Sequence, residues 1–261
     1  MDLCISTWFG YKYSFDEIIK LIKNVGFQSV MTWWGDEFIE RDGQPKEKKP
    51  DIIRRSELRL ENVHFSIFNI NDIWLDTIDG QKLLDKYIEN IDDCKIHEIP
   101  TAVVHIIDGY NPPPYNQLGL DRFKRIIDKA EKRNINIALE NLTKPEYLEY
   151  IYKNIKSSKL KFCYDSGHEN CLTPNYNHLD KYSEKLVALH LHDNNGIKDQ
   201  HLLPFDGSIN WKKIMDRINN ANYKGTLALE IEAQCIDGSK EYTAEEYLQN
   251  AKNRIYKLIN I

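Results

Sequence analysis

The sequence predicts an α/β fold, a (β/α)8 barrel that forms one domain over residues 1–261. Short runs rich in apolar and β-branched residues alternate with amphipathic stretches along the whole length, in eight strand-then-helix pairs. No linker, low-complexity tract or change in composition divides the chain. A doubly wound open sheet is the alternative, but no Gly-x-Gly-x-x-Gly follows the first expected strand to bind a dinucleotide.

The expected strands share an apolar core that is bounded by turn-forming residues. They cover residues 3–8, 29–34, 62–66, 102–106, 135–140, 160–165, 186–192 and 226–231. The seventh opens with the run Leu-Val-Ala-Leu, and such continuous apolar runs are typical of parallel strands buried on both faces. The strand pattern therefore predicts a parallel sheet.

Amphipathic segments predict a helix after each strand. The expected helices cover residues 15–25, 52–60, 81–96, 120–133, 145–155, 178–184, 211–220 and 243–258. Ser14 and Glu17 form a capping box that begins the first helix, Gly26 ends it, and Pro145 suits the first turn of the fifth. The charged segment 35–50 and the proline run 112–114 are expected to be loops.

Composition and charge exclude several classes of protein. The net charge of −5 argues against nucleic acid as a partner, because such domains usually carry a basic face. No apolar run is long enough to cross a bilayer and the first residues show no export signal, so we expect a cytoplasmic protein without a membrane partner. The cysteines at positions 4, 94, 163, 171 and 235 include no Cys-x-x-Cys pair and are expected to be reduced thiols.

The seventh expected strand and the segment after it concentrate ligand-type side chains: His190, His192, Asp193, Asp199 and His201. Residues two apart share a face of a strand, so His190 and His192 point the same way if the strand continues. Three imidazoles and two carboxylates suit a divalent metal such as zinc or manganese, with magnesium or cobalt as alternatives. A polar strand end with solvated histidines is the other interpretation, and one such pair alone would favour it.

Further ligand-type residues end other expected strands: Glu140, Asp165 and Glu230, with His64 and His105 near the ends of the third and fourth. The C-terminal face of such a barrel carries the active site. Taken singly, either histidine would more often be a hydrogen-bonded core residue, and Glu140 could pair with a Lys or Arg. Several carboxylates buried together are costly without a cation, and a shared metal ion supplies that charge.

Candidate substrate contacts are Trp8, Trp34 and Lys144, which lie near expected strand ends or their loops. Apolar ring faces stack on the C–H surfaces of sugars, although ordinary packing explains either tryptophan equally well. A phosphorylated substrate would require an Arg or Lys cluster at the mouth. Lys144 and Lys198 are the obvious candidates, so a phosphate group is unsupported.

Short motifs, taken in order, resemble the xylose isomerase-like superfamily of TIM barrels. They are Leu139-Glu140-Asn141, Tyr164-Asp165-Ser166-Gly167-His168, Leu189-His190-Leu191-His192-Asp193, Asp199-Gln200-His201 and Leu229-Glu230. The resemblance covers essentially the whole chain. This superfamily contains sugar isomerases and epimerases, inosose dehydratases and the endonuclease IV family, so the resemblance implies a TIM barrel with a divalent metal and a small carbohydrate substrate.

For the sugar epimerases of that superfamily, the resemblance implies a metal ion held by Glu140, Asp165, His190 and Glu230. It also implies that Glu140 and Glu230 act as acid and base on opposite faces of the substrate, while the metal stabilises an enediolate. His168 matches a histidine that contacts the substrate near its carbonyl. We therefore expect a metal-dependent isomerase or epimerase of a sugar or sugar phosphate and, because such barrels often associate, a homo-oligomer.

The alternative is a multinuclear zinc phosphodiesterase that resembles endonuclease IV. The additional metal positions of that family match here on His64, His105, His168, Asp199 and His201, which leaves the number of ions at one or more. Gln200 stands where that family has an arginine, and the acidic chain also weighs against this hydrolase. The same positions recur in sugar enzymes and do not decide the reaction. A non-catalytic metal or sugar binder is a third class.

Overall fold

In the computed structural model of the protein, residues 2–37, 39–233, 235–236, 239–240 and 242–261 are described. Eight parallel strands form the expected (β/α)8 TIM barrel: β1 (Leu3–Ser6), β2 (Ser29–Trp34), β3 (Arg59–Phe65), β4 (Thr101–Val104), β5 (Asn136–Glu140), β6 (Leu160–Asp165), β7 (Leu186–His190) and β8 (Leu227–Leu229). They lie in the order β7-β6-β5-β4-β3-β2-β1-β8. Consecutive strands of the chain thus lie side by side, which is the arrangement that strand–helix–strand units produce.

The barrel closes between β7 and β8, one residue beyond the end of β7. Leu191 pairs with Leu229 in a parallel bridge. The Leu191 amide donates to the carbonyl of Ala228 at 2.9 Å, and the Glu230 amide donates to the carbonyl of Leu191 at 3.2 Å. The C-terminal ends of all eight strands therefore surround one mouth.

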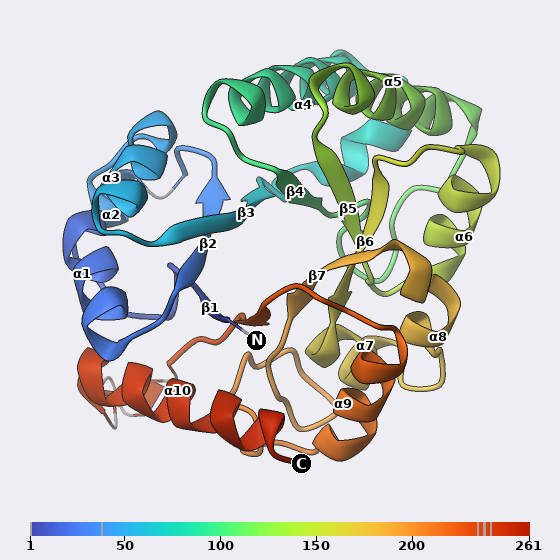
Figure 1. The fold of residues 1–261 in the computed structure, drawn as a ribbon. Coiled ribbons are helices and arrows are strands. Elements are labelled where there is room, and N and C mark those ends of the chain that lie inside the picture. The colour runs from blue at the N-terminus through green and yellow to red at the C-terminus, as the bar shows by residue number, and fades with distance from the viewer. Residues whose placement is uncertain (1, 38, 234, 237–238, 241) are drawn as a thin grey trace.

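Helices form an outer ring around the strands, and in Figure 1 the colour passes round this ring from blue to red in chain order. They are α1 (Phe15–Val25), α2 (Ile39–Asp42), α3 (Lys49–Arg55), α4 (Ile78–Ile96), α5 (Gln117–Arg133), α6 (Pro145–Asn154), α7 (Ser166–Leu172), α8 (His178–Tyr182), α9 (Trp211–Asn220) and α10 (Ala244–Ile259). Short 3-10 turns are η1 (Lys46–Lys48), η2 (Ile70–Trp74) and η3 (Ser183–Lys185). A small antiparallel pair, β9 (Cys235–Ile236) and β10 (Ser239–Lys240), precedes α10.

The barrel interior is filled by one small or medium-sized side chain from each of seven strands. These are Cys4, Met31, Val103, Ala138, Cys163, Ala188 and Ala228, and they pack in two clusters apart from the large core between sheet and helices. Residues two positions apart share a face of a strand, so the residue two positions after each faces the mouth. On five strands that residue is a metal-ligand type: His105, Glu140, Asp165, His190 and Glu230.

Predicted boundaries are confirmed where a local signal defines them. Ser14 and Glu17 make the expected capping box, and Gly26 ends α1 in the left-handed conformation with φ of 96°. The bounds of α1, β2, β6 and α9 are those predicted. Strands β1, β4, β7 and β8 are shorter than expected, so Trp8, His105, His192 and Glu230 lie just beyond their strands.

The prediction for residues 35–60 is wrong in two respects. The segment expected to be a loop contains α2, η1 and the start of α3. The helix expected over residues 52–60 ends at Arg55, because Glu57 turns the chain with φ of 56° and Arg59 begins β3, its amide donating to Gln28 at 3.1 Å. Helix α7 and the β9–β10 pair were not expected either.

Two predictions from composition bear on the fold. Within the residues that the structure describes, no helix has the length and apolar character needed to cross a membrane. Cys4, Cys94 and Cys163 are buried free thiols and Cys171 is a partly buried one. The side chain of Cys235 lies outside the described part of the chain.

Candidate metal centre at the barrel mouth

Four ligand-type side chains converge at the mouth, each from the end of a different strand. Glu140 ends β5, Asp165 ends β6, His190 ends β7 and Glu230 follows β8. The first three are completely buried and Glu230 is 6% exposed. Each offers one ligand atom, and these atoms lie within 4.8 Å of one another. We call this group the first cluster.

Imidazoles surround the Glu140 carboxylate. His190 Nδ1 lies 3.3 Å from its Oε1, while His64 Nε2 and His105 Nε2 lie 3.2 Å and 3.3 Å from its Oε2. Burial alone would raise the pKa of Glu140, but His190 and His105 hold it well below its ordinary value. The carboxylate is therefore ionised. His168 Nδ1 also lies 3.2 Å from its Oε1, so four rings share one negative charge.

A second cluster, His168, His192, Asp199 and His201, adjoins the first. Asp199 Oδ2 lies 3.2 Å from His168 Nε2 and 3.1 Å from His201 Nε2. Burial alone would raise the pKa of Asp199, but the hydrogen bonds to these two histidines hold it far below its ordinary value. Conversely, burial would lower the pKa of His201, and the bond to Asp199 raises it to about 9.

The orientation of two rings requires a positive charge between each ring and the carboxylate that it faces. His64 Nδ1 lies 2.7 Å from the next main-chain carbonyl, and His201 Nδ1 lies 2.8 Å from the carbonyl of Glu230. Each Nδ1 therefore donates its proton to the main chain, and Nε2 faces a carboxylate, Glu140 or Asp199. A neutral ring in this position would oppose two lone pairs, so a second proton or a metal ion must lie between. Histidine ligands of metals usually donate the other ring N–H to a carbonyl in this way.

The clusters lie at the bottom of a cavity of about 190 Å³. Its lining consists of Trp8, Trp33, His64, Ile67, His105, Glu140, His168, Asp199, His201, Glu230 and Glu232. Trp33 stacks on His64 with centroids 5.0 Å apart and planes at 4°, and Trp8 meets Trp33 edge-on at 5.9 Å. The cavity thus combines an aromatic wall with an acidic, imidazole-rich floor.

Two of the predicted substrate contacts lie away from this cavity. Trp34 is fully buried and its indole N–H donates to Asp93 of α4 at 3.3 Å. Lys144 precedes α6 and does not line the cavity. Trp33 lines it instead, because Trp33 follows the interior residue Met31 by two positions and Trp34 points to the opposite face. Trp8 lines the cavity as expected.

Asp193 was expected among the ligand-type residues, and this is wrong. Its carboxylate accepts hydrogen bonds from the amides of Asn194, Phe205 and Ile209, at 2.9 to 3.1 Å, and from the indole of Trp211 at 2.8 Å. Asp193 therefore fixes the loop that leads from β7 to α9. Ile67 and Glu232 were not expected in the cavity, although Glu232 stands two residues after Glu230.

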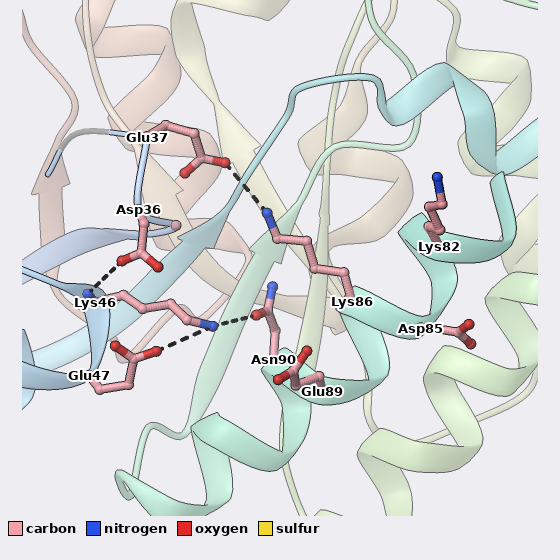
Figure 2. A pocket seen from close by; sticks show the side chains of 10 residues that line it. Asp36, Glu37, Lys46, Glu47, Lys82, Asp85, Lys86, Glu89 and Asn90 are labelled. Atoms are coloured by element: carbon pink, nitrogen blue, oxygen red, sulfur yellow. Dashed lines mark hydrogen bonds and ion pairs between the residues drawn. The ribbon is translucent and has the colours of Figure 1, made fainter. Parts of the chain in front are cut away.

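A larger depression, of about 780 Å³, lies outside the barrel between α4 and the segment after β2 (Figure 2). Figure 2 shows Lys86 pointing to Glu37, and Lys46 to Glu47 and Asn90. The Lys86–Glu37 and Lys46–Glu47 pairs have N···O distances of 3.7 Å and 3.8 Å. Lysines lie among the carboxylates here and pair with some of them, so we assign no catalytic site to this surface.

Comparison with known proteins gives one family and one fold. The xylose isomerase-like TIM barrel family model matches residues 19–254. The uncharacterized protein y4fM of Sinorhizobium fredii is 33% identical over 50% of this chain and 47% of its own length. The uncharacterized protein MJ1311 of Methanocaldococcus jannaschii is 28% identical over 51% of this chain and 52% of its own length. The chain thus spans about half the length of these curated relatives.

Solved structures share the fold over nearly the whole chain. A D-tagatose 3-epimerase-like protein has a TM-score of 0.79 at 20% identity, covering 100% of this chain and 97% of its own. D-psicose 3-epimerase from Clostridium cellulolyticum H10 has a TM-score of 0.79 at 13% identity, covering 100% and 99%. A structure of L-ribulose 3-epimerase has a TM-score of 0.77 at 12% identity, covering 99% and 94%.

Proposed function

Because the chain belongs to the xylose isomerase-like TIM barrel family, we propose that it is a metal-dependent sugar isomerase or epimerase. The observation that carries the proposal is the first cluster, in which Glu140, Asp165, His190 and Glu230 bring buried ligand atoms within 4.8 Å of one another. The cavity above it, of about 190 Å³, is smaller than the roughly 300–1,000 Å³ of drug-sized sites and suits a small metabolite. The named activities of the similar structures, which act on ketoses, support the same substrate class.

Three carboxylates and one imidazole are donors that suit Zn²⁺ or Mn²⁺, and Mg²⁺ or Co²⁺ fit the same oxygens. A bound ion would supply Lewis acidity, which polarises a substrate carbonyl and makes the neighbouring C–H more acidic. The protein would supply the remaining chemistry: binding, orientation and proton transfer.

Glu140 and Glu230 are the proposed acid and base. Burial alone would raise the pKa of Glu230, but His190, whose Nδ1 lies 3.0 Å away, lowers it to about 2. Both carboxylates are therefore ionised at neutral pH and able to accept a proton from the carbon next to a carbonyl. The glutamate that accepts this proton can return it to the neighbouring carbon, which gives an isomer. An epimer requires the other glutamate to take up a proton from solvent and deliver it to the opposite face of the same carbon.

The aromatic wall and His168 are proposed to orient the substrate. Trp8 and Trp33 present apolar ring surface on which sugar C–H groups stack. His168 Nδ1 lies 3.2 Å from Glu140 Oε1, so a substrate that contacts His168 also reaches the proposed base. Glu232 lines the same cavity and is a proposed hydrogen-bond acceptor for sugar hydroxyls.

A multinuclear zinc phosphodiesterase is the second candidate, and one observation favours it. Among the residues that the structure describes, three groups of ligand-type residues occur side by side: the first cluster, the second cluster, and His64 with Glu140 and His190. Against it, none of the described residues that line the cavity is a lysine or arginine able to bind phosphate.

Metal content and proton exchange test the proposal. The protein is purified without chelator, its metal is measured by inductively coupled plasma mass spectrometry, and ketoses such as D-tagatose and D-psicose are incubated with it in D₂O. Deuterium at the carbon beside the carbonyl, together with a new epimer or isomer, is the expected result. Two or three zinc ions with cleavage of abasic DNA would favour the phosphodiesterase. A protein that neither contains nor takes up metal would contradict both.

A further inference from the structure

His192 is a completely buried histidine of the second cluster to which neither the resemblance nor the proposed mechanism gives a role. We propose that His192 is a positioning residue that orients the Asp165 carboxylate within the first cluster, and that it is not itself a metal ligand. This inference rests on the proposed binding of a divalent ion.

The contacts of the ring place His192 with Asp165. Its Nε2 lies 3.1 Å from each Asp165 oxygen and 3.7 Å from Asp199 Oδ1. Its Nδ1 is buried without a hydrogen-bond partner among the described residues, so Nε2 is the nitrogen that donates. Asp165 Oδ1 also accepts the amide of His168 at 2.6 Å. The carboxylate is therefore held by two donors, one from the start of α7 and one from the segment after β7.

Four consecutive residues, from the last residue of β6 into the start of α7, surround this ring. Asp165 accepts its N–H, and the Ser166 hydroxyl donates to the His192 carbonyl at 2.8 Å and accepts the His192 amide at 3.0 Å. A Cβ at Gly167 would lie 1.9 Å from His192 Cε1, so glycine leaves the space that the ring fills. His168 packs edge-on against the ring at 6.0 Å. Because these contacts hold the His192 ring on several sides, we expect the ring to stay in place and not to rotate toward a bound ion.

The stacking of His192 on His201 argues against ligation by both rings. Their centroids are 3.9 Å apart and their planes differ by 10°. An imidazole binds a metal along its own ring plane, so two nearly parallel stacked rings cannot both point at one ion. His201 Nε2 already faces Asp199 at 3.1 Å. His201 is thus the proposed metal ligand of the second cluster, and the His192 ring packs against the face of the His201 ring.

Hydrogen bonds that orient a metal-ligating carboxylate typically contribute about 10- to 100-fold in metal affinity. We expect His192→Leu, which removes the donor, to weaken binding of Mn²⁺ to the first cluster by about 10- to 100-fold. The number of ions bound at saturation should stay that of the wild type. His192→Gln, which keeps an N–H donor, should recover most of the affinity. His97→Leu, which removes an imidazole near the end of α4, is the matched control and should leave affinity unchanged.

The experiment is a titration of each metal-free protein with Mn²⁺ by isothermal calorimetry, with the absorption spectrum of the Co²⁺-loaded protein as a second readout. One ion fewer at saturation, or a Co²⁺ spectrum changed by His192→Gln, would identify His192 as a ligand and overturn the inference. Wild-type affinity in His192→Leu would overturn it as well.

Gly167→Ala provides an independent variant if His192→Leu does not fold, since the added Cβ displaces the ring from Asp165. It should also weaken Mn²⁺ binding without loss of an ion, and unchanged affinity would contradict the role of the ring. These readouts do not depend on turnover. A wild-type protein that binds Mn²⁺ but acts on no sugar would contradict the proposed function, while the affinities would still decide the role of His192.

Discussion

The outer depression of Figure 2 and the cavity at the mouth differ in the balance of their charges. The depression, of about 780 Å³, has three lysines among five carboxylates in the described part of its lining, and Lys86 pairs with Glu37 across it. The cavity, of about 190 Å³, has four carboxylates and four histidines but no lysine or arginine among its described lining residues. Buried carboxylates without a lysine or arginine as counter-ion, and not volume, distinguish the candidate site.

Glu37 connects the two regions. Its Oε1 lies 3.7 Å from Lys86 in the depression, and its Oε2 accepts the indole N–H of Trp33 at 3.2 Å. A Cβ at residue 35 would lie 1.7 Å from that Oε2, so Gly35 is needed for the carboxylate to fold back. The outer ion pair therefore supports the aromatic wall of the cavity.

The largest expected effect comes from Glu140→Gln, which removes the carboxylate shared by the imidazoles at the mouth. Turnover of the metal-loaded protein should fall by about 10²- to 10⁴-fold, the usual contribution of a general base. Initial rates measured at saturating ketose check this. Glu89→Gln, a matched change in the outer depression, should leave the rate unchanged. Full activity of Glu140→Gln would refute the assigned role.

Removal of the bound ion should affect the mouth and not the depression. Chelation is expected to lower the free energy of unfolding by about 2.7 kcal/mol if the free ion was at about 100 times its dissociation constant. The physical reason is that buried carboxylates lose their counter-charge. Urea unfolding with and without chelator measures the difference. Lys86→Gln should show the same difference as wild type, and a chelator effect that survives Glu140→Gln would contradict the assignment.

The stability of the metal-free protein should depend on pH through the second cluster. His201 titrates at about 9 in the folded protein, against about 6.5 in an unfolded chain. Its proton therefore stabilises the fold fully below about pH 6.5, and this stability is lost as the pH rises through about 9. Because a bound cation would replace this proton, the stability gained from metal should grow over the same range. Unfolding midpoints with and without Mn²⁺ measure this gain, and a constant gain would contradict it.

The smallest expected effect tests the connection through Glu37. Glu37→Leu removes one hydrogen bond from Trp33, worth about 1 kcal/mol, so the KM for the sugar should rise about fivefold with little change in kcat. Glu37→Gln keeps the acceptor and should behave as wild type. Lys82→Gln, at an exposed pair with Asp79, should change neither constant. A KM unaffected by Glu37→Leu would show that the two regions are independent.

The fold was predictable because segments with the hydrophobic period of a strand alternate with segments that have the period of a helix. Capping residues also mark several helix ends. Ser14, Glu17 and Gly26 defined α1, whereas the end of α3 has no Gly, Pro or Asn. There Glu57 adopts a positive φ that its type rarely favours, so only pairing of β3 with β2 explains why the helix stops.

The position of the candidate site was predictable from the sequence, but the directions in which its side chains point were not. Polar residues at strand ends stand out against apolar runs, which indicated the first cluster. Choosing Trp34 over Trp33 required knowledge of which face of β2 points inward, and both neighbours are the same residue type. The two-residue spacing of His190 and His192 suggested equal roles, yet β7 ends at His190 and the two rings serve different carboxylates.

The barrel closes beside Leu191, so the point of closure adjoins the first cluster. His190 belongs to one side of this point and Glu230 to the other, and their side chains meet at 3.0 Å. An ion bound by both residues would cross-link segments forty residues apart and would hold the barrel closed at this point. The stability of the closed barrel and the position of Glu230 for proton transfer would then depend on the same contact. The two properties should therefore be gained or lost together.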